Sequence, residues 1–195
     1  MKNIVIFVEG ETEEELYNAF ILKDIKCKLS SNKYTCNFSV HNVRGFGGFK
    51  NDALRKYKNE ILKKYPNDDF FVFLCYDTDV FEIASKPKID WKLIDKSLKD
   101  AGVKRVVHIK AKTCIEDWLL ADLKNICKYL RISQDVNVKG KNGFEKMKTL
   151  FKKANKIYIK GKKVEGLLSK LDINIILEKY LDELKSLYKE FGVII

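Results

Sequence analysis

Short apolar runs, each followed by acidic residues, constrain the fold of this chain most strongly. The runs at 4–8, 70–76 and 106–109 have the length of buried strands, and such runs are typical of a parallel sheet. Acidic residues stand directly after the first two runs, and Glu116 follows the third after a short interval. In open α/β sheets, functional groups gather just beyond the carboxyl ends of the strands. The pattern therefore predicts an α/β fold whose acidic side chains meet at one edge of the sheet.

Strand and helix patterns alternate along the first 130 residues. We expect strands at 2–8, 33–43, 70–76 and 104–109, and helices at 12–24, 51–65, 90–101 and 114–130. Thr12 and Glu15 have the spacing of a capping box for the first helix, and Asn51 or Asp52 can cap the second. This alternation predicts a mainly parallel, Rossmann-like sheet with helices on both faces. Residues 1–130 are interpreted as the core.

The pattern changes after residue 130. Residues 131–195 are interpreted as a basic, mainly helical C-terminal extension that packs on the same domain. Helices are expected at 144–154, 164–171 and 174–191, and residues 157–159 suit one more edge strand.

The composition indicates a folded, cytoplasmic protein. Hydrophobic residues make up 46% of the chain, which is typical of a globular core. No apolar run approaches the roughly 20 residues that cross a bilayer, and the N-terminus lacks a signal-peptide pattern, so no membrane association is expected. The five cysteines form no Cys-x-x-Cys pair, which makes a zinc site improbable and favours reduced, mostly buried thiols.

The formal net charge is +11, and its excess is uneven. Residues 139–163 hold ten lysines and one acid, Glu145, for a local net charge of +9. One interpretation is a solvated, lysine-rich helical surface. The other is a face that binds the phosphates of a nucleic acid, which the acidic clusters elsewhere favour. The candidate nucleic-acid-binding residues are Lys110, Lys112, Lys152, Lys153, Lys160, Lys162 and Lys163.

Five acidic residues are candidate metal ligands: Glu9, Glu13, Asp77, Asp79 and Glu116. Glu9 stands at the exit of a buried strand, where a carboxylate is costly unless it is paired. Asp77 and Asp79 are two residues apart, so in extended chain both point the same way. Grouped carboxylates repel one another unless a cation lies between them, and Mg²⁺ or Mn²⁺ takes oxygen ligands. Alternatively, the acids after Gly10 and around Glu116 are ordinary first turns of helices.

These residues also carry a resemblance to a known family. Val8-Glu9-Gly10 with Thr12-Glu13, then Asp77-Thr78-Asp79, then Ile115-Glu116 with Trp118-Leu119-Leu120 resemble the Toprim domain. In particular, the chain is similar to small stand-alone Toprim proteins of the RloB and AbiLii type, which are related to OLD-family nucleases. The motifs span residues 2–123, and Lys162-Lys163-Val164 resembles the family's C-terminal part more loosely.

The resemblance implies a Mg²⁺- or Mn²⁺-dependent endonuclease with one or two ions. Glu9, Asp77, Asp79 and Glu116 would be its catalytic acids, and Glu13 would help to hold one ion. Lys110, Lys112 and Lys160 are candidates for an assisting lysine. The resemblance further implies a role as the effector of a phage-defence (abortive infection) system. The chain has no Walker A sequence, so a partner ATPase of the OLD or ABC type would be separately encoded.

Other interpretations stay open. Three glycines, Gly45, Gly47 and Gly48, allow close backbone approach and predict a phosphate-binding loop, although a turn between strand and helix explains them too. A metal-dependent phosphatase or nucleotidyltransferase is the alternative enzyme. The non-enzymatic alternative is a module that binds nucleic acid or docks a partner. The choice between DNA and RNA is not encoded in any of these motifs.

Overall fold

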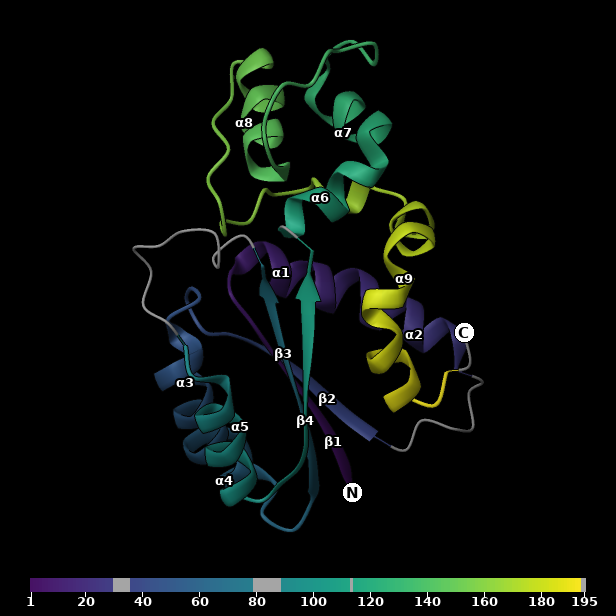
Figure 1. Cartoon of the computed structure of the whole chain (residues 1–195). Coiled ribbons are helices and arrows are strands. Elements are labelled where there is room, and N and C mark those ends of the chain that lie inside the picture. The colour runs from purple at the N-terminus through teal and green to yellow at the C-terminus, as the bar shows by residue number, and fades with distance from the viewer. Residues whose placement is uncertain (30–35, 79–88, 113, 194–195) are drawn as a thin grey trace.

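A four-stranded parallel sheet forms the centre of the molecule (Figure 1). The computed structural model describes residues 1–29, 36–78, 89–112 and 114–193. The strand order is β2-β1-β3-β4. The strands are β1 (Lys2–Val8), β2 (Cys36–Asn42), β3 (Asp69–Asp77) and β4 (Val103–Ala111). The predicted α/β class and the parallel, Rossmann-like sheet are confirmed.

Helices cover both faces of this sheet (Figure 1). One face carries α1 (Glu11–Glu15), the π-helical stretch η1 (Leu16–Ile21), α2 (Leu22–Lys28) and α9 (Ile173–Glu190). The other face carries α3 (Gly48–Lys56), the π-helical stretch η2 (Tyr57–Ile61), α4 (Leu62–Lys64) and α5 (Trp91–Asp100). Side chains along β1 alternate between the two cores, with Ile4 and Ile6 on the first face and Val5 and Phe7 on the second. Because helices cover both faces of the sheet, residues 4–8 of β1 are all apolar.

The remaining helical segments lie beyond the carboxyl ends of the strands (Figure 1). They are α6 (Ile115–Leu119), η4 (Leu120–Asp122), α7 (Leu123–Leu130), α8 (Gly143–Lys153) and η5 (Leu168–Lys170). Met147 and Leu150 of α8 are buried in the same core cluster as Ile4 and Ile6 of β1. No helix in the described part of the chain is long and apolar enough to cross a membrane.

The predicted helix caps at Thr12 and at Asn51 or Asp52 are wrong. The first helix begins at Glu11 after Gly10, without a side-chain cap, and the second begins at Gly48 after Gly47. The Thr12 hydroxyl does not cap its own helix, because it donates to the backbone carbonyl of Lys162 at 2.9 Å. A contact from a distant segment has replaced the local cap.

Three further expectations differ from the structure. The helix expected at 114–130 is broken at Asp122, whose carboxylate accepts from Asn125 N at 3.3 Å and caps α7. Residues 164–171 form turns and only the short η5. Residues 157–159 are not a strand of the described sheet. Of the strand expected at 33–43, residues 33–35 lie outside the described residues.

Candidate functional site

Four carboxyl groups come from the carboxyl edge of the sheet. Glu9 follows β1, Asp77 is the last residue of β3, Glu13 lies in α1, and Glu116 lies in α6 shortly beyond β4. Because β1, β3 and β4 are adjacent parallel strands, their ends bring together residues more than 100 positions apart. The negative charges of Asp77, Glu116 and Glu9 all act on Glu13. Glu9, Glu13, Asp77 and Glu116 therefore form one electrostatically connected set, which we call the acid cluster.

Hydrogen bonds fix three of these carboxylates. The Asp77 N–H donates to Glu9 Oε1 at 2.8 Å, which ties the ends of β1 and β3 together. The Ile115 N–H donates to Asp77 Oδ1 at 2.9 Å and joins β3 to the start of α6. The Tyr158 hydroxyl donates to Glu116 Oε1 at 3.1 Å. Each carboxylate thus keeps a defined orientation with one oxygen committed to the fold.

Burial disfavours the charged forms of the cluster. Glu13, Asp77 and Glu116 are 6%, 2% and 0% exposed. Burial, and then repulsion from Asp77, raises the pKa of Glu13 to about 8. Burial likewise raises the pKa of Asp77 to about 8, although the nearby Lys160 ammonium opposes the rise. Glu13 Oε2 and Glu116 Oε2 are buried and have no hydrogen-bond partner among the described residues.

The segment 160–163 brings a lysine into this site from far along the chain. Lys160 Nζ lies 3.0 Å from Asp77 Oδ2. The segment is held on the start of α1, where the Glu11 N–H donates to the Gly161 carbonyl at 2.8 Å and Lys162 Nζ pairs with Glu11 at 2.9 Å. A Cβ on Gly10 would lie 2.8 Å from the Cα of Gly161, so only glycine allows this approach.

The type of donor fits a hard divalent cation. Carboxylate oxygens are the ligands that Mg²⁺ and Mn²⁺ favour, and Glu13 and Glu116, each with a buried oxygen that has no hydrogen-bond partner among the described residues, lie close enough for their charges to interact. Within the described part of the chain, however, no three His, Cys, Asp or Glu side chains stand at the spacing of a metal site. Asp79 lies outside the described residues. Lys160 supplies the positive charge beside Asp77.

The other candidate lysines lie in three places. Lys110 and Lys112 are exposed at the end of β4 and just after it, and Lys152 and Lys153 are exposed on α8. Lys162 and Lys163 pair with Glu11 and Glu15 at 2.9 and 3.4 Å, so both ammonium groups already have acidic partners. Only Lys160 of the seven contacts the acid cluster in the described residues.

The glycine loop lies beside Glu9. The Gly45 N–H donates to the Glu9 carbonyl at 2.7 Å, and the Gly48 N–H donates to the Gly45 carbonyl at 2.9 Å. A Cβ on Gly48 would lie 1.8 Å from the Val43 carbonyl oxygen, whereas one on Gly47 would meet open space. The N–H groups of Gly45 and Gly48 therefore form backbone hydrogen bonds, and close packing against Val43 requires glycine at position 48.

Two buried residues outside the predicted site set hold parts of the structure together. Tyr158 is 4% exposed and holds Glu116 from 42 positions away. Asp122 is buried and accepts from the Asp172 N–H at 2.7 Å, so it joins α7 to the start of α9. Alternation around 157–159 was a signal that one of these side chains faces inward, but it did not indicate toward which group.

Comparison with known proteins found no relative of this chain. No protein-family model, no curated protein and no solved structure matches the chain.

Proposed function

We propose that this chain is a divalent-metal-dependent nuclease that cleaves phosphodiester bonds in DNA or RNA. The observation that carries the proposal is the acid cluster at the ends of three neighbouring strands, in which buried oxygens of Glu13 and Glu116 have no hydrogen-bond partner among the described residues. The strongly basic region 139–163, with its net charge of +9, supports a polyanionic substrate. A cluster that attracts cations beside a surface that attracts polyanions is the combination a nuclease needs.

Glu13, Asp77 and Glu116 would hold the cation, with Glu9 at the rim and Asp79 added on sequence grounds. A bound divalent cation would supply a hydroxide-like nucleophile near neutral pH and would neutralise charge on the scissile phosphate. Glu9 is the least buried of the four described acids, so its carboxylate is the best placed to take a proton from an attacking water. Lys160, whose ammonium group lies beside Asp77, would place its positive charge near a phosphate oxygen of the substrate.

The Toprim resemblance supports the same proposal and extends it. Proteins of the RloB and AbiLii type imply a role in phage defence together with an ATPase subunit. We propose such a separately encoded ATPase as a partner, so cleavage is to be measured both for the isolated chain and with the product of any adjacent ATPase gene.

The test is cleavage of labelled single- and double-stranded DNA and RNA in Mg²⁺ or Mn²⁺. Glu9→Gln, Asp77→Asn and Glu116→Gln each keep side-chain shape while removing charge, and each is expected to lower the cleavage rate at least about 100-fold. Glu14→Gln, in the same helical turn as Glu13 but with no part in the cluster, is the matched control. Wild-type cleavage by Asp77→Asn would refute the proposal. Metal-dependent hydrolysis of phosphomonoesters alone would favour a phosphatase, and binding without any cleavage would favour a binding module.

A further inference from the structure

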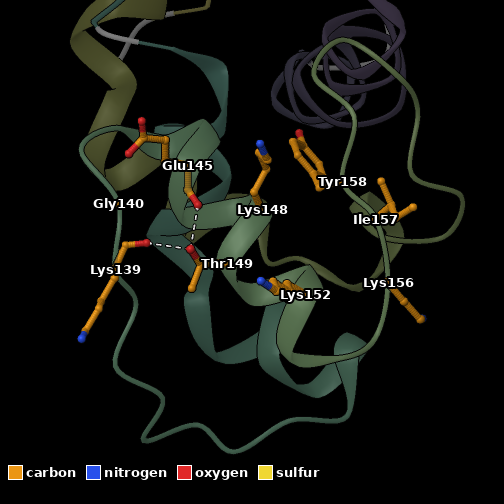
Figure 2. A pocket seen from close by; sticks show the side chains of 9 residues that line it. All are labelled: Lys139, Gly140, Glu145, Lys148, Thr149, Lys152, Lys156, Ile157 and Tyr158. Carbon is orange, nitrogen blue, oxygen red and sulfur yellow. Dashed lines mark hydrogen bonds between the residues drawn. The ribbon is translucent and has the colours of Figure 1, made fainter.

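A second feature, distinct from the acid cluster, is a pocket of about 600 Å³ on α8 (Figure 2). Its floor is one face of the helix, where Glu145, Lys148, Thr149 and Lys152 recur at the helical spacing of three and four residues. The loop at 139–140 forms one wall, and residues 156–158 form the other. The volume lies within the range of roughly 300–1,000 Å³ that small-ligand sites occupy.

Specific contacts hold the first wall in place. The Thr149 hydroxyl contacts the Lys139 carbonyl at 2.8 Å and the Glu145 carbonyl at 3.0 Å, as the dashed lines in Figure 2 show. A Cβ on Gly140 would lie 2.6 Å from the Lys146 nitrogen, so the loop lies flat against α8. The pocket is therefore built by the fold and is more than a gap between exposed lysines.

The charge of the pocket is strongly positive. Four lysines line it: Lys139, Lys148, Lys152 and Lys156. None of the four forms an ion pair among the described residues. The one acid in the lining, Glu145, accepts from the Lys141 N–H at 2.8 Å as part of the start of α8. A concave site with this excess of positive charge favours a ligand with several negative charges.

An apolar surface adjoins these lysines. Ile157 lines the pocket and is 85% exposed, and Ile159, two residues on, is 59% exposed. Tyr158 between them faces inward and donates to Glu116, so the same segment touches both the pocket and the acid cluster. Lys156 and Lys160 are four residues apart, which spans at most about 14 Å of chain.

We propose that this pocket binds the backbone phosphates of a single-stranded nucleic acid, close to the bond cut at the acid cluster. The inference rests on the proposed nuclease function, whose substrate class it narrows. A pocket of this volume accepts a nucleotide of one strand but cannot enclose a duplex. The exposed Ile157 side chain can contact a base only where that base is unstacked and unpaired.

The test measures binding alone, in EDTA, so that it does not depend on cleavage. Fluorescence anisotropy with a labelled single strand and its duplex gives the dissociation constant over a range of salt concentrations. The triple variant Lys148→Gln, Lys152→Gln, Lys156→Gln is expected to weaken single-strand binding at least about tenfold. It is also expected to reduce the salt slope, the slope of the logarithm of the binding constant against the logarithm of the salt concentration, by about 2 in magnitude. The control removes the same charge from α5 through Lys92→Gln, Lys96→Gln and Lys99→Gln, all exposed, and is expected to change the slope by less than half as much.

Apolar contact is tested separately by Ile157→Ser, with Leu93→Ser on α5 as its control, since Leu93 is also exposed. Ile157→Ser is expected to weaken single-strand binding about fivefold and to leave duplex binding unchanged. Equal losses of single-strand affinity in the pocket variant and the α5 control variant would refute the pocket as the binding site. Equal or tighter binding of the duplex would refute the preference for a single strand. Because binding is measured in EDTA and cleavage separately in Mg²⁺, single-strand binding that depends on the pocket lysines, found together with no cleavage by the wild-type chain, would refute the nuclease proposal and leave this one standing.

Discussion

Replacing Glu13 by Gln is expected to stabilise the metal-free protein, by an amount that grows with pH. Glu13 is 6% exposed, and its pKa is raised to about 8 from the ordinary 4.5. Between those two pH values the folded chain holds a proton that the unfolded chain has released. Stability therefore falls as the pH rises through this window. Glutamine is neutral at every pH and removes this dependence.

The size of the effect follows from the two pKa values. Each tenfold change in proton concentration within the window changes the free energy of unfolding by about 1.4 kcal/mol. The Gln variant therefore gains about 1 kcal/mol at pH 5 and about 3 kcal/mol at pH 7, before any cost of the amide. For a chain of this length, 1 kcal/mol corresponds to about 2–4 °C in Tm, so the gain at pH 7 is at most about 12 °C.

Thermal unfolding in EDTA at pH 5, 6, 7 and 8 measures this gain. Glu14→Gln makes the same chemical change in the same helical turn and controls for the helix dipole. Any packing cost of the amide is the same at every pH, so the slope of Tm against pH isolates the electrostatic part. Parallel pH profiles for the two variants would show that the pKa of Glu13 is not raised, and the interpretation of Glu13 as a buried carboxyl among other acids would be wrong.

Three further substitutions test how the site is held. Gly10→Ala forces a Cβ against Gly161 and is expected to lower the free energy of unfolding in urea by about 1–3 kcal/mol. Gly47→Ala, where a Cβ meets open space, is the neutral control. Equal stability of the two variants would contradict the close approach of Gly10 and Gly161. Tyr158→Phe removes the hydroxyl that donates to buried Glu116 and is expected to lower the free energy of unfolding by about 1–3 kcal/mol, also measured in urea. No loss of stability would mean that water replaces the hydroxyl. Asp122→Ala removes the acceptor of two backbone N–H groups and is expected to lower Tm by several degrees, a loss that the exposed Asp135→Ala variant does not share.

The sheet was predictable from the sequence because its signal is local. Ile4 to Val8 are buried, as is the run from Phe70 to Tyr76 except the half-buried Phe71, so coverage of both sheet faces makes each run apolar, and the structure has β1 and β3 at those positions. The edge strand β2 is only half-buried along its length, and its pattern is correspondingly weaker. Acidic residues directly after two central strands then placed Glu9 and Asp77 at the same edge.

The parts that could not be predicted depend on distant contacts. Thr12 has the sequence pattern of a helix cap, but its hydroxyl contacts the Lys162 carbonyl, 150 positions away. Among three candidate lysines, only the packing of 160–163 on α1 identifies Lys160 as the one beside Asp77. The pocket on α8 likewise requires two separate loops to lie on either side of one helix face. Local periodicity contains no information about such pairings.

The packing of residues 158–163 near the first helix also determines when, during synthesis, the acid cluster can be completed. Lys160 reaches Asp77, Tyr158 reaches Glu116, and Lys162 reaches Glu11, contacts that join positions 83, 42 and 151 residues apart. A growing chain that has not yet released this segment from the ribosome lacks all three contacts, and its acidic residues face water without their partners. Synthesis itself thus delays the finished acid cluster until residues 158–163 have left the ribosome.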